Sequence, residues 1–195
     1  MAKILVIAEH ADGALNPSTA KCVACARSIP DADIDVAVFA ADGETVAADV
    51  ARLESVSKVL RVDNDANANP LAAVIAPQVV ELAAQYTHIL GPSTTYGKDL
   101  MPRVAALLGV NQVSDIMDVL GSHSFKRPIY AGNAIVTVDV PGDSTVVATV
   151  RTASYQAVAT GGGAAIETAT TAGEIPTHTR YVELQSGASD RPDLQ

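Results

Sequence analysis

Three scarcities limit what this protein can be. The sequence has no tryptophan, and only 4% of its 195 residues are aromatic although 48% are hydrophobic. Its core must therefore be built from small aliphatic side chains. No apolar run approaches the roughly 20 residues of a membrane-spanning helix. Positive charge is also short, because 13 Lys and Arg stand against 22 Asp and Glu. The net charge of −9 argues against a surface for nucleic acid or anionic membranes.

Cysteine is scarce as well. The two cysteines present, Cys22 and Cys25, form a C-x-x-C motif. A redox pair of this kind usually sits at a helix N-terminus, where the helix dipole lowers the thiol pKa. Here the pair falls inside a helical pattern that opens near residues 16–18, on one face with Ala26 and Ile29. No second Cys or His pair completes a zinc site. We interpret both as small core residues, with a thiol oxidoreductase as a weaker hypothesis.

The first 109 residues alternate between short apolar strands and amphipathic helices. We expect strands at 3–8, 34–39, 58–62 and 88–90, helices at 17–28, 42–53, 70–86 and after residue 94, and a loop at 63–69. Asp42 is a candidate N-cap. Pro77 should divide the helical pattern of 70–86 into two pieces. Such alternation predicts a mainly parallel sheet with helices on both faces, joined by right-handed crossovers.

Residues 87–109 are the most informative stretch, because a strand, a turn of small residues and a helix follow one another. Leu100, Val104, Leu107 and Leu108 share one helical face, and Gly109 is a plausible C-cap. In open α/β sheets, ligands bind at the carboxyl ends of the strands. The turn is therefore the first place to look for a ligand loop.

The turn fails the tests for a phosphate loop. Between Gly91 and the Gly97-Lys98 pair stand five residues instead of four, and Asp99 replaces the hydroxyl that would hold Mg²⁺. Pro92 also removes a backbone N–H donor. No G-x-G-x-x-G follows the first strand, where the segment 9–13 (EHADG) brings two acids that would repel a pyrophosphate.

Other polar residues give no complete catalytic pattern. The four histidines, His10, His88, His123 and His178, lack metal-ligand spacing, although His10 beside Glu9 and near Asp12 could act as an acid–base group. Ser114, Asp115, Arg127 and Tyr130 place polar groups on apolar strands, as interface contacts or as catalytic ones. No G-x-S-x-G elbow is present. From the residues alone we predict no catalytic, cofactor-binding or metal-binding residue.

Beyond Gly109 the pattern becomes β-rich. We expect strands over 112–120, 129–140, 145–151 and 181–184, with a hairpin turn at 141–144 (PGDS). The glycine run 161–163 is not followed by Asp-Ser, so it does not match the pyrophosphate loop of ATP-dependent amidotransferases. With the Ala/Thr-rich run to Gly173 it predicts a loop. We therefore expect a small antiparallel β extension, a domain over 1–185, and a linker over 186–195.

Several ordered segments resemble the α subunit of the electron transfer flavoproteins, and together they span essentially the whole chain. They are LVIAEH at 5–10, YTHI at 86–89, GKDLMPRVAA at 97–106, VSDI at 113–116, RPIYAGNA at 127–134, Val150-Arg151 with Ser154-Tyr155, and SDRPDL at 189–194. The strings at 113–116 and 127–134 are the most specific of them.

This resemblance implies a three-layer, adenine-nucleotide-hydrolase-like α/β domain that pairs with a similarly folded β subunit. In that family FAD is held chiefly by the C-terminal domain of the α subunit, and AMP is held by the β subunit. The sequence stops at the linker where the Gly/Arg/Ser-rich flavin segment would begin. We therefore expect no cofactor in this chain alone.

The function that the resemblance implies is a scaffold and subunit-pairing domain of a heterodimeric electron carrier, not an enzyme. The parent complex would carry electrons from flavin dehydrogenases, such as the acyl-CoA dehydrogenases of fatty acid oxidation, to a quinone-linked oxidoreductase. No signal or transit pattern precedes the first strand, so a cytoplasmic location is expected. The alternative is a stand-alone adenine-nucleotide-binding module of the stress-protein type, in which the helix N-terminus after Gly91 holds the anion.

Overall fold

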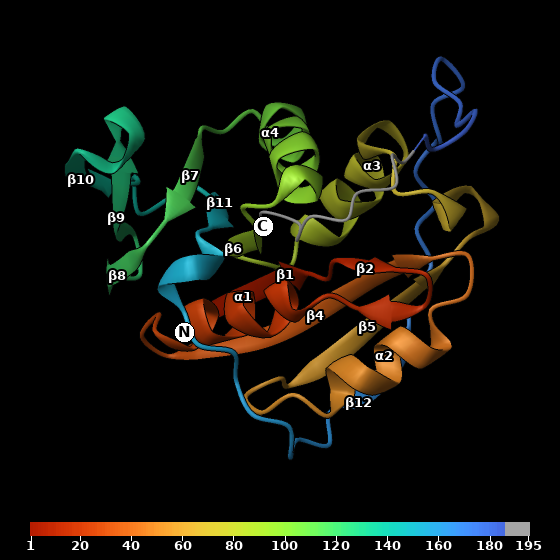
Figure 1. Cartoon of the computed structure of the whole chain (residues 1–195), viewed down its shortest axis with the longest axis horizontal. Helices are drawn as coiled ribbons and strands as arrows, with labels where there is room; N and C mark the ends of the chain where they lie inside the picture. Colours follow the sequence, from red (N-terminus) through yellow and green to blue (C-terminus); the bar gives the residue numbers. More distant parts are fainter. Residues whose placement is uncertain (186–195) are drawn as a thin grey trace.

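Seven short strands form one sheet in the computed structural model, which describes residues 1–185 (Figure 1). In spatial order they are β12 (Ala165–Thr168), β5 (Lys58–Asp63), β4 (Ala32–Ala40), β1 (Ala2–Ile7), β6 (His88–Pro92), β11 (Val146–Val150) and β7 (Gln112–Ile116). All neighbouring pairs are parallel. The central strands are nearly all apolar because both of their faces are covered.

Two helices cover each face of the sheet, which confirms the predicted three-layer α/β class. In Figure 1, α1 (Pro17–Arg27) and α2 (Glu44–Ala51) lie below the sheet, and α3 (Ala72–Ala83) and α4 (Thr95–Leu108) lie above it. The side chains of β1 alternate between the two cores. Ile4 and Val6 pack on the side of α1 and α2, whereas Leu5 and Ile7 pack on the side of α3 and α4.

Most helix starts and stops follow the local signals. Asn16 caps α1 by accepting a hydrogen bond from the Ser18 N–H at 2.9 Å, and Pro17 follows it. Gly109 ends α4 in the left-handed conformation, with φ of 68°. The cap of α2 differs from the prediction. Gly43 is its N-cap, and Asp42 accepts only the N–H of Glu44, at 3.1 Å.

The prediction that Pro77 splits its helix is wrong, because α3 runs through it without a break. Ile75, Ala76 and Val79, on both sides of the proline, are at most 1% exposed. An interior proline costs a helix about 3 kcal/mol. The apolar face that α3 buries on the sheet and on α4 outweighs that local cost.

Two other expectations, one for a loop and one for a helix face, also need correction. The predicted loop at 63–69 contains a short 3-10 helix, η1 (Asp65–Ala68). Its buried Asn67 exchanges amide hydrogen bonds with Gln78 of α3, at 2.6 and 3.2 Å. In α4, Leu107 is 52% exposed, although Leu100 and Val104 are buried as expected. Met101 and Ala105 are buried as well and shift the centre of the buried face, so Leu107 falls at its rim.

The predicted antiparallel extension is present, with boundaries that differ from the prediction. Strands β8 (Asp118–Gly121), β9 (Ser124–Ile129) and β10 (Ala134–Asp139) form a separate sheet in the order β10-β9-β8. The strand expected over 129–140 is interrupted by η2 (Tyr130–Gly132), whose three residues all have positive φ. The strand expected over 112–120 is split into β7 and β8, and Asp115 near the break has φ of 61°.

The turn at 141–144 forms, closed by a hydrogen bond from the Ser144 N–H to the Pro141 carbonyl at 3.0 Å. It is not a hairpin turn, because it connects β10 of the small sheet to β11 of the large one. A true hairpin occurs directly after β1, where β2 (His10–Ala11) pairs with β3 (Ala14–Leu15). Asp12 and Gly13 form its turn with positive φ.

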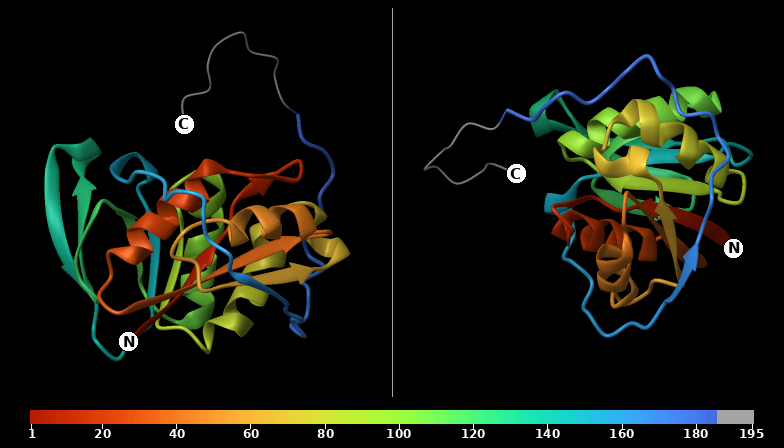
Figure 2. Two further views of the ribbon diagram at one scale, coloured as in Figure 1. Left: turned by 90° about the horizontal axis from the view of Figure 1, so that it is seen from below. Right: turned by 90° about the vertical axis from the view of Figure 1, so that its right-hand side faces the viewer.

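The chain after β11 wraps around the domain from one helix layer to the other (Figure 2). After η3 (Thr152–Ser154), it passes the end of α2, where the N–H groups of Gly161 and Gly162 both donate to the Arg52 carbonyl. It then pairs as β12 with β5, inside the segment predicted as a loop. Beyond β12, the Glu81 carboxylate of α3 accepts the backbone N–H groups of residues 172 and 173.

The remaining expectations on the tail differ in outcome. The strand expected over 181–184 is not formed, and that segment is irregular. The linker predicted for 186–195 lies outside the described residues. Across 1–185, no helix is both long enough and apolar enough to cross a membrane.

Candidate functional site

A cleft of about 400 Å³ lies where the order of the parallel strands reverses. From β1 the chain builds the sheet outward through β4 and β5 on one side, and β6 begins the other side. This reversal point, at the carboxyl ends of the strands, is where open α/β sheets bind ligands. The cleft is lined by residues that follow β1 or open α1 and α4, with two from η3: Glu9, Asn16, Pro17, Ser18, Lys21, Ser93, Thr94, Thr95, Lys98, Thr152 and Ala153.

The carboxylate of Glu9 connects the two helix starts in this cleft. Its Oε2 accepts a hydrogen bond from Ser18 Oγ of α1 at 2.6 Å and another from Thr94 Oγ1, the N-cap of α4, at 3.1 Å. The Glu9 main chain is held too, since its N–H donates to Thr19 Oγ1 at 3.0 Å. A helix N-terminus carries partial positive charge, so a carboxylate is favourable at this point.

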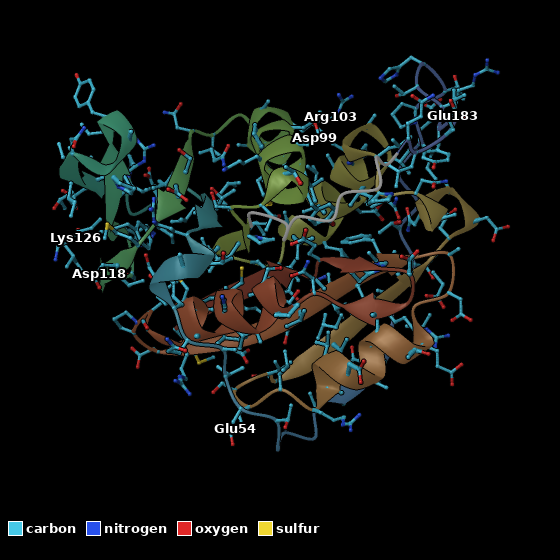
Figure 3. All side chains as sticks on the ribbon, in the orientation of Figure 1. Glu54, Asp99, Arg103, Asp118, Lys126 and Glu183 are labelled. Carbon is cyan, nitrogen blue, oxygen red and sulfur yellow. The ribbon has the colours of Figure 1, made fainter. Side chains whose placement is uncertain are left out.

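The glycines of the candidate phosphate loop serve packing. A Cβ on Gly97 would lie 1.8 Å from the Pro92 carbonyl oxygen, and one on Gly91 would lie 2.8 Å from Met101 Sδ. The N–H of Gly97 is directed to Thr94 Oγ1, at 3.4 Å. Asp99, at the position where a phosphate loop has its hydroxyl, is exposed on α4 (Figure 3). The loop allows α4 to start directly against the end of β6.

The candidate acid–base residues after β1 do not converge on the cleft. His10 is half-buried, and its Nε2 is 2.8 Å from the Phe39 carbonyl oxygen of β4. Asp12 is exposed in the hairpin turn, and neither residue lines the cleft. Of Glu9, His10 and Asp12, only Glu9 lines the cleft. Within residues 1–185, no group of three His, Cys, Asp or Glu side chains is placed to hold a metal ion.

His88 is buried far from the cleft, at the start of β6. Its Nε2 donates to the Ser122 carbonyl at 2.6 Å, and its Nδ1 lies 2.8 Å from Thr87 Oγ1. His123 lies beside it, with ring centroids 5.4 Å apart. Burial lowers the pKa of His88, and His123 adds to this effect. His88 therefore connects the large sheet to the β8–β9 turn as a neutral imidazole.

The burial of His88 predicts that acid destabilises the protein. Because its pKa is lower in the folded state than the ordinary value of about 6.5, the unfolded chain takes up the proton first. Stability should fall as the pH drops below about 6.5, with this residue contributing up to about 1.4 kcal/mol per pH unit. Urea unfolding from neutral pH to about pH 5 gives the slope of the free energy of unfolding against pH. This slope should be smaller for His88→Gln than for the wild type. His178→Gln, at an exposed histidine, should keep the wild-type slope, and an equal slope in all three proteins would contradict the assignment.

The two cysteines are core residues of α1, as predicted. Both are free and 0% exposed, and burial is the main cause that raises the pKa of each, that of Cys25 to about 12. We expect the native thiols to react with a disulfide reagent at least about a thousandfold more slowly than an ordinary thiol of pKa near 8.5. Ellman's reagent, with and without urea, tests this. Rapid reaction of the folded protein would revive the thiol hypothesis.

The polar residues near the small sheet pair with one another. Arg127 donates to the Ser114 carbonyl and hydroxyl oxygens at 2.7 and 2.9 Å. Asp115 pairs with Arg151 at 2.9 Å, a partner that no sequence pattern indicated.

The Tyr130 side chain, in contrast, remains 79% exposed. Farther along the small sheet, Lys126 pairs with Asp118 at 3.0 Å (Figure 3). These contacts join β9 to β7 and β8, and join β7 to the residue after β11. None of these residues lines the cleft.

Comparison with known proteins gives a consistent result. The model of the electron transfer flavoprotein domain family matches residues 4–179. The chain is 45% identical over 191 residues to the electron transfer flavoprotein subunit alpha of Pseudomonas aeruginosa, covering 98% of this chain and 61% of that protein. It is 40% identical over 192 residues to that of Paracoccus denitrificans, covering 98% and 61%.

A mitochondrial relative also matches. The electron transfer flavoprotein subunit alpha, mitochondrial, of Dictyostelium discoideum is 35% identical over 205 residues, covering 97% of this chain and 58% of that protein. The chain thus spans about three fifths of the length of the curated relatives that it matches. The chain belongs to the electron transfer flavoprotein family, in which it corresponds to the N-terminal domain of the α subunit.

Proposed function

We propose that this chain is the scaffold and subunit-pairing domain of a heterodimeric electron transfer flavoprotein. The observation that carries the proposal is the family match over residues 4–179, which covers the large sheet, its four helices and the small sheet. The partner would be the electron transfer flavoprotein β subunit. The complete carrier would take electrons from flavin dehydrogenases, such as acyl-CoA dehydrogenases, and deliver them to a quinone-linked oxidoreductase.

The family name implies a flavin, and the residues of the cleft do not fit one. The Glu9 carboxylate holds the two helix starts at which a pyrophosphate would have to be cradled. Gly97 is required by its close approach to the Pro92 backbone, and Gly91 packs against the Met101 side chain. We therefore assign no electron-transfer step to residues of this chain. In the proposal, FAD is held mainly by a C-terminal domain of the α subunit, and AMP is held by the β subunit.

The proposal also keeps the predicted division of the chain. Residues 1–185 form the α/β domain, and 186–195 lead as a linker toward the FAD-binding domain. The protein acts as part of an electron carrier and not as an enzyme. A cytoplasmic location stays a prediction, since the relatives include bacterial and mitochondrial proteins.

Co-expression with a cognate β subunit tests the pairing. We expect a stable one-to-one complex in size-exclusion chromatography, and a colourless protein when the chain is purified alone. Co-expression with an unrelated α/β protein of similar charge provides the control. A chain that elutes alone in the presence of the β subunit would contradict the pairing, and strong flavin absorbance of the chain alone would overturn the assignment of FAD to another domain.

The adenine-nucleotide-binding module remains the second candidate, because a cleft does lie at the reversal point of the sheet. Calorimetric titration of the chain with ATP and with AMP separates the two functions. Absence of heat at millimolar nucleotide removes this candidate, whereas saturable binding would support it.

A further inference from the structure

We propose that the Glu9 carboxylate is the resident anion of the cleft between β1 and β6. It occupies the place that a ligand phosphate takes in sheets of this topology, and it keeps phosphate out. Removing this carboxylate should turn the cleft into a binding site for inorganic phosphate and for the phosphate of AMP. The inference concerns the cleft alone and does not depend on subunit pairing.

The first support is that the carboxylate contacts both helices that a phosphate would contact. Ser18 lies in the first turn of the 11-residue α1, and Thr94 caps the 14-residue α4. Both hydroxyls converge on the same oxygen, Glu9 Oε2. The distance of 2.6 Å from Ser18 Oγ is typical of a charge-assisted hydrogen bond. A single carboxylate therefore lies at the N-terminal ends of two helices, where the partial charge is positive.

The second support is the charge that would be left without Glu9. Lys21 and Lys98 line the same cleft, and Glu9 is the only acidic residue among the lining residues that the structure describes. With Glu9 neutralised, two ammonium groups and two helix N-termini would face the cleft with no negative charge among them. Such a combination favours a small anion.

The third support is that hydroxyls stand ready to donate to an anion. When the Glu9 side chain is removed, Ser18 Oγ and Thr94 Oγ1 lose their shared acceptor. Ser93 Oγ is buried at the edge of the cleft and has no hydrogen-bond partner among residues 1–185. Buried hydroxyls without acceptors cost stability, and the oxygens of a phosphate can satisfy several at once.

The test compares Glu9→Ala with the wild type in phosphate and in sodium chloride of equal ionic strength. In chloride, we expect the variant to melt about 2–6 °C below the wild type. Phosphate stabilises folded proteins in general, so the wild type should melt slightly higher in phosphate than in chloride. The gain of Glu9→Ala in phosphate should exceed that of the wild type and recover much of the loss. Isothermal titration with inorganic phosphate and with AMP should give the variant at least about tenfold tighter binding than the wild type.

Glu44→Ala is the matched control. Glu44 also lies in the first turn of a helix, α2, but it is exposed and does not line the cleft. Its removal should leave the difference in melting temperature between phosphate and chloride equal to that of the wild type. If Glu44→Ala responds as Glu9→Ala does, the effect is a general property of helix ends, and the inference is wrong.

A second variant decides the matter should Glu9→Ala fail to fold. Glu9→Gln keeps the shape and one acceptor oxygen but removes the charge. A resident anion predicts that this variant melts below the wild type at low salt and that the gap narrows as salt rises. Equal melting of Glu9→Gln and wild type would overturn the proposal, and so would tight phosphate binding by the wild type.

Discussion

Gly97→Ala should destabilise the protein by more than about 3 kcal/mol. The added Cβ would lie 1.8 Å from the Pro92 carbonyl oxygen and 2.9 Å from its carbon. This obstacle is backbone, so no side-chain rotation relieves it. The strand cannot retreat freely either, because Pro92 is in register with Val150 of β11, and the Ser93 N–H donates to the Val150 carbonyl at 2.8 Å. Moving β6 would break the centre of the sheet.

Urea unfolding followed by circular dichroism measures this loss. Gly142→Ala provides the matched control, since a Cβ there meets no atom within 4 Å. That variant should stay within about 0.5 kcal/mol of the wild type. If Gly97→Ala were as stable as Gly142→Ala, the close approach of α4 to β6 would be wrong.

Phe125→Ala should cost about 3–5 kcal/mol. Phe125 is 0% exposed and is the largest fully buried side chain in the described chain. From β9 it packs into the core on the side of α1, with Val119 of β8 and Val138 of β10 directly opposite it in register. The surrounding side chains are mostly small and aliphatic, so they cannot fill the space that an aromatic ring leaves. The small sheet would lose its main anchor to the large one.

Unfolding in urea gives the free energy, and amide hydrogen exchange locates the effect. Exchange should accelerate most in β8, β9 and β10. Ile135→Ala is the control, because Ile135 is 57% exposed on the same small sheet and should cost under about 1 kcal/mol. Equal costs for the two variants would show that Phe125 does not anchor the sheet.

The candidate site shows how far local reasoning reaches. Spacing, Pro92 and Asp99 argued against a phosphate loop at residues 91–98. These local features did not explain the two glycines. Gly97 lies against the end of β6 and Gly91 lies against Met101, and both contacts form only when the helix packs on the strand.

Glu9 was predicted to repel a pyrophosphate, and the structure adds the contacts through which its carboxylate holds the cleft. Ser18 is nine residues away in sequence and Thr94 is 85 residues away. No local pattern joins positions so far apart. A signal did exist, because Glu9 lies two residues after the end of β1, and Thr94 directly precedes the helix after β6. Strand ends that become neighbours at the reversal point of a sheet must bring such residues together.

The sequence by itself determined the class of fold and the family. Apolar periods of two and of 3.6 residues depend on near neighbours, so the parallel sheet and its two helix layers could be predicted. The tertiary structure decided the rest. It kept α3 whole through Pro77, ended β9 at Ile129, and made an edge strand of residues 165–168 by pairing them with β5. Each of these outcomes depends on contacts between distant segments, whose packing energy outweighs local propensity.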